Sequence, residues 1–101
     1  MKHFAALLHL QDAEKNVSLR PRHLAFLAAQ EAAGKVFARG PFADGTGGLV
    51  IYRSESLEKA GQLAESDPYV AEGARRLELH EWRMTTGDDM RSADRALSNV
   101  P

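Results

Sequence analysis

The sequence contains no cysteine, which excludes a disulfide framework, a thiolate metal site and a thiol nucleophile. Positive and negative side chains nearly balance, with 13 lysines and arginines against 14 aspartates and glutamates, so the basic excess of a general nucleic-acid-binding protein is missing. No apolar run approaches the roughly 18 residues of a membrane-spanning helix. We therefore expect a protein that contacts neither nucleic acid nor membrane. Its chemistry must depend on histidine, carboxylate and arginine side chains.

The chain does contain enough apolar material for one compact domain. It has 101 residues, and 44% of them are hydrophobic, which lies within the usual range of a single domain. The apolar stretch in residues 1–10 is too short, and too interrupted by histidine, for a secretion signal. These features predict a cytoplasmic protein.

The first strand and the first helix are predicted from local patterns. Residues 3–10 alternate in the manner of a strand and are largely apolar on both faces, which is typical of a central strand. Residues 12–18 are polar, and we expect them to form a loop. A helix then begins at Ser18 or Arg20, which places Pro21 in its first turn, where the missing N–H does no harm.

The remaining elements follow from turn residues and hydrophobic spacing. They are a helix end at Gly34, a strand over 35–39, a strand over 49–52, a helix from Ser54 or Ser56 to about Ser66, a helical turn over 68–73 capped by Asp67, and a strand over 77–84. The two middle strands form a hairpin. The whole order is that of the ferredoxin-like α+β class, βαββαβ, in which a four-stranded antiparallel sheet carries its helices on one face.

The other face of this sheet predicts a partner. A large apolar patch would be left in water on this face, formed by Leu7, by Ile51 or Val50, and by Trp82. The simplest way to bury this patch is a second subunit. We divide the chain into a folded domain, 1–84, and a polar C-terminal tail, 85–101. We expect the tail to pack across a homodimer. A higher oligomer is also compatible with this expectation.

A histidine stands near the expected start of the first helix. His23 follows Arg20 and Arg22, and the positive end of the helix dipole would favour its neutral imidazole, which can accept a proton. The alternative is a partly exposed histidine beside solvated arginines. Asp67 directly precedes Pro68, as helix caps often do, and one carboxylate oxygen can cap while the other orients an imidazole. Spacing alone leaves open whether His23 and Asp67 meet.

Several short motifs stand in a defined order along the chain. They are Arg20-x-x-His23-Leu24, Gly34, Arg39-Gly40-Pro41, Gly48-Leu49, Ser56-Leu57-Glu58-x-Ala60, Asp67-Pro68-Tyr69, and a closing strand that ends at Trp82. In this order they resemble the YciI-like (YCII-related) family over about residues 1–84. The resemblance implies a ferredoxin-like fold, pairing of two sheets into a dimeric α/β barrel, and a site built around a His-Asp pair. The tail after Met84 departs from the family pattern.

The resemblance also implies a function, because the family is related to small enzymes that isomerise, cleave or dehalogenate ring-derived metabolites. We expect a cofactor-free lyase or isomerase acting on a small carbonyl-containing or aromatic-derived metabolite. His23 is the candidate general base, Asp67 its orienting partner, and Arg39, or else Arg20, the group that holds an anionic substrate. Further candidates for substrate binding are Gly40, Pro41 and Tyr69. The alternative is a non-catalytic dimeric module that binds a small ligand or a partner protein.

Phosphate and metal sites are not expected. The glycines over 40–48 fit neither phosphate-loop pattern and are explained by turns. His3 and His9 share one strand face but lie about 20 Å apart at the strand rise, too far to share an ion. His9 and His80 could meet only if the register allows. With no cysteine and no paired-histidine motif, the sequence predicts no metal.

Overall fold

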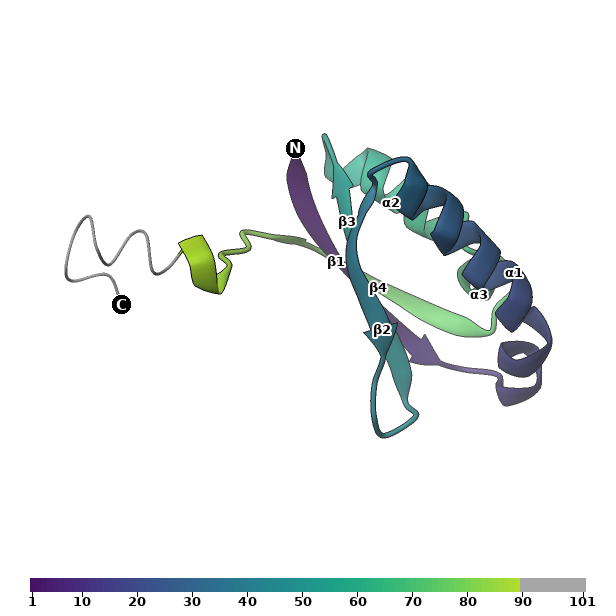
Figure 1. The fold of residues 1–101 in the computed structure, drawn as a ribbon. Helices are drawn as coiled ribbons and strands as arrows, with labels where there is room; N and C mark the ends of the chain where they lie inside the picture. Colours follow the sequence, from purple (N-terminus) through teal and green to yellow (C-terminus); the bar gives the residue numbers. More distant parts are fainter. Residues whose placement is uncertain (90–101) are drawn as a thin grey trace.

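The computed structural model describes residues 1–89, which form one four-stranded sheet with helices on a single side (Figure 1). The strands lie in the order β2-β3-β1-β4, and every neighbouring pair is antiparallel. The elements are β1 (Lys2–Leu10), α1 (Ala13–Ala32), β2 (Val36–Pro41), β3 (Gly47–Ser54), α2 (Leu57–Glu65), α3 (Pro68–Ala71) and β4 (Arg75–Trp82). This is the ferredoxin-like α+β fold that the order of elements predicted, with the middle strands paired as a hairpin.

The core lies between the sheet and the helices. Phe4, Ala6 and Leu8 are buried on the helix side of β1, and the register sets Phe4 opposite Tyr52 and Ala6 opposite Val50. Directly opposed residues of antiparallel strands point to the same face, so these side chains form one layer. The pairing of β1 with β3 on one side and β4 on the other confirms that it is a central strand.

The first helix begins earlier than predicted. Asp12 is its N-cap, with a carboxylate oxygen 3.1 Å from the backbone nitrogen of Lys15, so the expected loop over 12–18 is helix instead. Ser18 does not cap, because its hydroxyl donates back to the Lys15 carbonyl, 3.3 Å away. Pro21 therefore lies inside α1, where proline usually costs about 3 kcal/mol. The burial of Leu19, His23 and Leu27 on one side of α1 offsets this cost.

The other helix boundaries agree with the predictions. Ser56 caps α2, with its hydroxyl oxygen 3.2 Å from the Lys59 nitrogen. Asp67 caps α3, and Gly34, with φ of 76°, follows the end of α1 in the left-handed conformation typical of such positions. The strands β2 and β4 are shifted by one or two residues from their predicted limits, and β4 begins at Arg75 rather than at residue 77.

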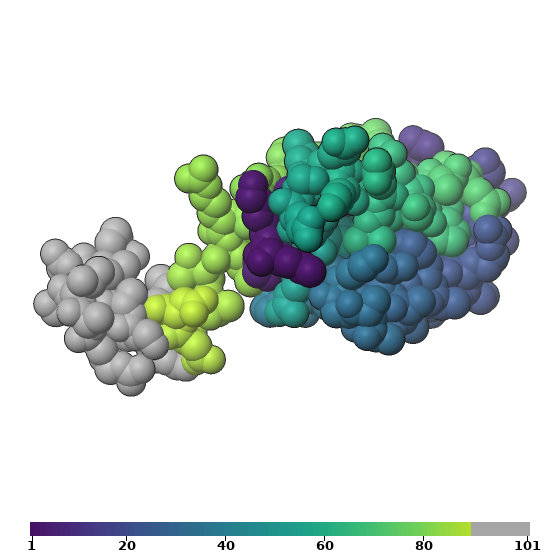
Figure 2. All heavy atoms as spheres, turned by 90° about the horizontal axis from the view of Figure 1, so that it is seen from above, coloured from purple at the N-terminus to yellow at the C-terminus, as the bar shows by residue number. Residues whose placement is uncertain are grey.

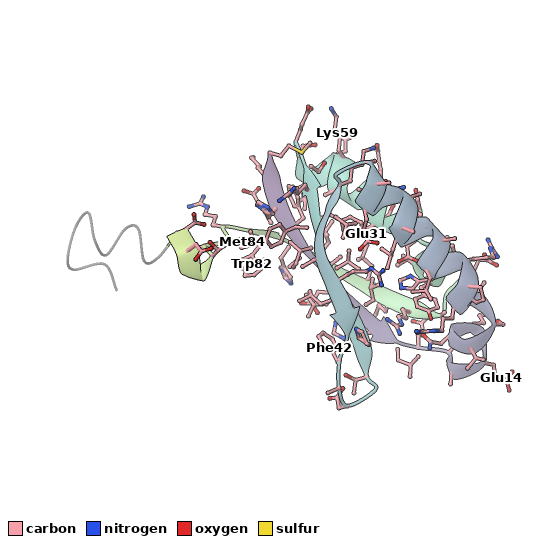
Figure 3. All side chains as sticks on the ribbon, in the orientation of Figure 1. Glu14, Glu31, Phe42, Lys59, Trp82 and Met84 are labelled. Carbon is pink, nitrogen blue, oxygen red and sulfur yellow. The ribbon has the colours of Figure 1, made fainter. Side chains whose placement is uncertain are left out.

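The sheet face away from the helices is open in the chain. Trp82 lies on that side (Figure 3) and is 44% exposed, and Phe37 is 42% exposed. The segment that follows β4 runs away from the compact body up to residue 89 (Figure 2). The rest of the predicted packed tail, 90–101, lies outside the described residues. In residues 1–89, no helix has the length and apolar character needed to cross a membrane.

Candidate functional site

The centre of the candidate site is a buried contact between α1 and the start of α3. His23 Nδ1 lies 2.8 Å from Asp67 Oδ1 and 2.9 Å from Asp67 Oδ2. His23 is 7% exposed and Asp67 is 0% exposed, so water does not compete for this interaction. A carboxylate accepts, so Nδ1 carries the hydrogen, and a neutral ring bonded in this way has its lone pair on Nε2. Nε2 makes no hydrogen bond to any residue in 1–89 and is not sealed off from solvent, and His23 lines a pocket.

His23 stands in the middle of α1, not in its first turn. The helix-dipole argument for a neutral imidazole was therefore wrong, because the dipole acts mainly at helix ends. The carboxylate of Asp67 supplies the orientation instead. The same carboxylate also accepts from the Tyr69 backbone nitrogen, 2.9 Å from Oδ1, and so caps α3.

Tyr69 forms one wall of the site. Its ring stacks on the His23 imidazole, with centroids 3.9 Å apart and planes inclined by 18°. The guanidinium of Arg75 lies over the same ring, with Cζ 4.4 Å from the centroid. Tyr69 is 1% exposed, and these contacts fix the plane of the imidazole.

A pocket of about 60 Å³ lies beside the imidazole, between α1, β2 and β3. Its lining includes His23 and the sequence-predicted residues Arg20, Arg39, Gly40, Pro41 and Tyr69. Asp67 lies behind the imidazole and does not line the pocket. The structure thus brings all the candidate residues to one place, with Asp67 one hydrogen bond away from the pocket.

Arg39 is already engaged by a carboxylate. Its Nε lies 3.0 Å from Glu31 Oε2, and its Nη2 lies 3.3 Å from Glu31 Oε1. Figure 3 shows Glu31 reaching from α1 toward β2. This ion pair raises the pKa of Arg39. Two of the donors of Arg39 are therefore occupied at the rim of the pocket.

Arg75, at the start of β4, also lines the pocket and was not among the predicted site residues. Its Nε donates to Asn16 Oδ1 over 2.8 Å. Burial lowers the pKa of Arg75, and the nearby charge of Arg20 lowers it further, while Tyr69 and Asp67 act in the opposite direction. The alternation of residues in β4 could have indicated its position. If the predicted strand is extended two residues toward the N-terminus, Arg75 lies on the same face as Leu77.

A second polar cluster lies on the open face of the sheet. His9 Nε2 is 2.8 Å from Glu78 Oε1, and His80 Nε2 is 2.6 Å from Glu78 Oε2. Hydrogen bonds from His80 and His9 lower the pKa of Glu78. The register does bring the two histidines to one carboxylate, but residues 1–89 hold no group of three or more histidine, cysteine, aspartate or glutamate side chains suited to a metal ion.

The model of the YCII-related domain matches residues 1–83. The chain belongs to this family. It is 37% identical over 62 residues to YjpA of Bacillus subtilis, an uncharacterized protein, covering 61% of this chain and 73% of YjpA. It is 41% identical over 70 residues to YciI of Escherichia coli O6:H1, covering 59% of this chain and 71% of YciI.

One solved structure resembles the fold closely. It is the 5-chloro-2-hydroxyhydroquinone dehydrochlorinase TftG of Burkholderia phenoliruptrix, in complex with 2,5-dihydroxybenzoquinone. The TM-score is 0.70 with 21% sequence identity, and the match covers 82% of this chain and 95% of TftG. At this identity the likeness shows the shared fold.

Proposed function

We propose that this YCII-related protein is a cofactor-free enzyme of the lyase or isomerase type, with His23 as its general base. The observation that carries the proposal is the buried hydrogen bond from His23 Nδ1 to Asp67, which leaves Nε2 without a partner in a residue that lines a pocket. The substrate class is a small carbonyl-containing or aromatic-derived metabolite. A pocket of about 60 Å³ suits a small molecule or one end of a larger one.

The chemistry assigned to the pair is proton abstraction next to a carbonyl or phenolic group. Nε2 takes the proton, and the ring becomes an imidazolium whose Nδ1–H remains bonded to the Asp67 carboxylate. Asp67 stabilises this charge where water is excluded, and it also holds the tautomer that keeps the Nε2 lone pair available. A positioned base of this kind typically contributes about 10²–10⁴-fold to the rate.

The walls of the pocket supply substrate contacts in this proposal. Tyr69 presents the ring on which the imidazole is stacked, and Gly40 and Pro41 of β2 form the opposite wall. Arg20 has no hydrogen-bonding partner in the described part of the chain, so its guanidinium is available to an anionic substrate. Arg39 is the weaker candidate, because Glu31 already occupies two of its donors.

The fold comparison supports the reaction class. TftG is named a dehydrochlorinase and is bound to a dihydroxybenzoquinone, a ring compound with carbonyl groups. An elimination of this kind needs a base and a site for a developing oxyanion, and both kinds of group line this pocket.

We extend the proposal to a homodimer in which a second copy covers the open sheet face, as in a dimeric α/β barrel. The face carries Leu7 and Leu49 beside the exposed Trp82 and Phe37, so a single subunit leaves these apolar side chains in water next to the polar cluster around Glu78. The cytoplasmic location expected from the sequence stays a prediction.

The test begins with a thermal-shift screen of small keto acids, hydroxyquinones and phenols, followed by product detection for each stabilising compound. A ligand at 100 times its dissociation constant adds about 2.7 kcal/mol to the stability of the native state, which is readily measured. We expect at least one compound to be converted by the wild type and not by His23→Gln. Stabilisation without turnover, or equal turnover by His23→Gln, would favour the alternative of a non-catalytic binding module.

A further inference from the structure

Arg75 is a half-buried cation whose outer donors are unused. Its Nε donates to Asn16. It has no ion-pair partner in residues 1–89, because no carboxylate oxygen lies within 4.0 Å of its nitrogens. Neither Nη atom is buried without a partner, so both keep some exposure, and Arg75 lines the pocket. A guanidinium that loses water without gaining an acceptor is costly, and a bound anion would remove that cost.

A second cation without an ion-pair partner lies near Arg75. Arg20 lines the same pocket, lies close enough to disfavour the charge on Arg75, and is likewise without an ion-pair partner in the described chain. None of the described residues that line the pocket is acidic. Asp67 favours the charge on Arg75, but both of its oxygens are bonded to His23, and the Glu31 carboxylate at the pocket rim is paired with Arg39. The pocket therefore has a positive wall formed by Arg20 and Arg75.

The fold holds Arg75 in a fixed place. Its guanidinium lies over the Tyr69 ring, and its Nη1 would be 3.0 Å from a Cβ placed on Gly48. A side chain at residue 48 would also come within 2.9 Å of the Gly40 carbonyl oxygen. The bare glycine thus leaves the space through which the guanidinium passes, and Asn16 fixes its tilt.

From these contacts we infer that Arg75, with Arg20, binds an anionic oxygen group of the ligand and holds it next to His23. The ligand class is a small organic anion that carries a carboxylate, enolate or phenolate oxygen. Tyr69 connects the two halves of the site, because its ring contacts both the imidazole and the Arg75 guanidinium. The inference rests on the proposed function only in placing the reacting carbon near Nε2, while anion binding itself stands without catalysis.

The experiment measures binding of formate, oxalate and malonate, with uncharged malonamide as the matched control ligand, at constant ionic strength. Binding is followed by thermal shift and by NMR of the arginine Nε–H signals. We expect the anions, and not malonamide, to stabilise the wild type and to move the Arg75 signal. Arg75→Gln and Arg20→Gln should each weaken anion binding about tenfold to a hundredfold, the range for hydrogen bonds to charged groups.

Arg76→Gln is the matched control, because it makes the same charge change one residue along β4, on the opposite sheet face. It should bind anions as the wild type does. Anion binding that is absent in the wild type, or equally reduced in Arg76→Gln and Arg75→Gln, overturns the inference.

A fourth variant, His23→Gln, separates this inference from the proposed function. His23→Gln should still bind anions, because the positive wall is intact. Anion binding through Arg75 without any turnover in the metabolite screen would overturn the enzyme and leave the anion site standing. Turnover that needs His23 but is unaffected by Arg75→Gln would overturn the anion site and leave the enzyme standing.

Discussion

The imidazole of His23 shares its Nδ1 hydrogen between both carboxylate oxygens of Asp67, at 2.8 and 2.9 Å, although 44 residues of chain separate them. One of these oxygens also accepts from the Tyr69 backbone. The carboxylate thus serves the side chain of one helix and the main chain of another. Changes at Asp67 should therefore affect both the proposed chemistry and the stability, and the two effects can be separated.

Replacing Asp67 by asparagine should disable the proposed base while it keeps the cap. The amide oxygen can still accept from the Tyr69 nitrogen, but an amide cannot stabilise an imidazolium, and it lets the ring adopt the other tautomer. We expect turnover of any substrate found in the screen to fall about 10²–10⁴-fold. Steady-state kinetics checks this, with circular dichroism to verify folding. A rate within a few fold of the wild type would remove the role assigned to Asp67.

Asp67→Ala should be much more damaging to stability than Asp12→Ala. Both residues cap a helix, and loss of a cap costs about 1 kcal/mol. Asp67→Ala also strands the buried Nδ1–H of His23, which adds about 1–3 kcal/mol. Urea unfolding of the two variants measures the difference. Equal losses would show that the His23 contact adds nothing to stability.

Tyr52 should make the protein sensitive to high pH. Burial raises the pKa of its hydroxyl, with a further rise from the charge of Asp67, so the folded state keeps the proton. A tyrosine in the unfolded chain ionises near pH 10. At about pH 11, the folded state has therefore lost about 1.4 kcal/mol of stability through Tyr52. This contribution is fully present below about pH 10 and is lost as the pH rises.

Tyr52→Phe isolates this effect. The hydroxyl has no hydrogen-bond partner in residues 1–89, so its removal should be neutral or slightly stabilising at pH 7. Above about pH 10 the variant should lose less stability than the wild type as the pH rises further. Unfolding measured at pH 7 and at several values above 10 tests both statements. Parallel curves for the two proteins would contradict the assignment to Tyr52.

Gly47 should tolerate no side chain. Its φ is 146°, and an added Cβ would lie 1.9 Å from the Leu8 carbonyl oxygen, so Gly47→Ala must distort the pairing of β1 and β3. We expect a loss above about 3 kcal/mol, with a shift of the thermal midpoint that reflects it. Gly45→Ala is the control, since Gly45 also has a positive φ, 78°, but has open space, and should cost about 1 kcal/mol.

The open sheet face should carry the dimer contact. Leu49→Lys places a charge in this face, opposite Leu7 of β1, and should convert the expected dimer into a monomer, because an unpaired buried charge is strongly unfavourable. Light scattering after size exclusion gives the mass. Val17→Lys, at a 75% exposed position of α1, is the matched control and should leave the mass unchanged. A wild-type monomer would contradict the proposed dimer directly.

Local rules of the sequence predicted much of this fold. The caps Ser56 and Asp67 and the turn at Gly34 depend on neighbouring residues alone, and each lies where it was expected. The predicted start of α1 was wrong, because Pro21 was interpreted as a first-turn residue. A proline inside a helix is compensated by tertiary packing, which local patterns do not contain.

The candidate site was predictable only in its residue types. The contact of His23 with Asp67 depends on how α3 packs against α1, and spacing along the chain cannot supply that distance. Arg75 was missed because its pocket position depends on the true start of β4 and on the gap at Gly48. Both are properties of the assembled sheet.

The short helix α3 has only four residues, and its first turn holds the cap that orients His23. If this single turn unwinds, Asp67 and Tyr69 leave the imidazole together. On warming, the proposed activity should therefore be lost before the sheet unfolds. The backbone amide of Tyr69 should exchange with deuterium faster than the amides of β1. Tightening that one turn would widen the temperature range over which the protein works.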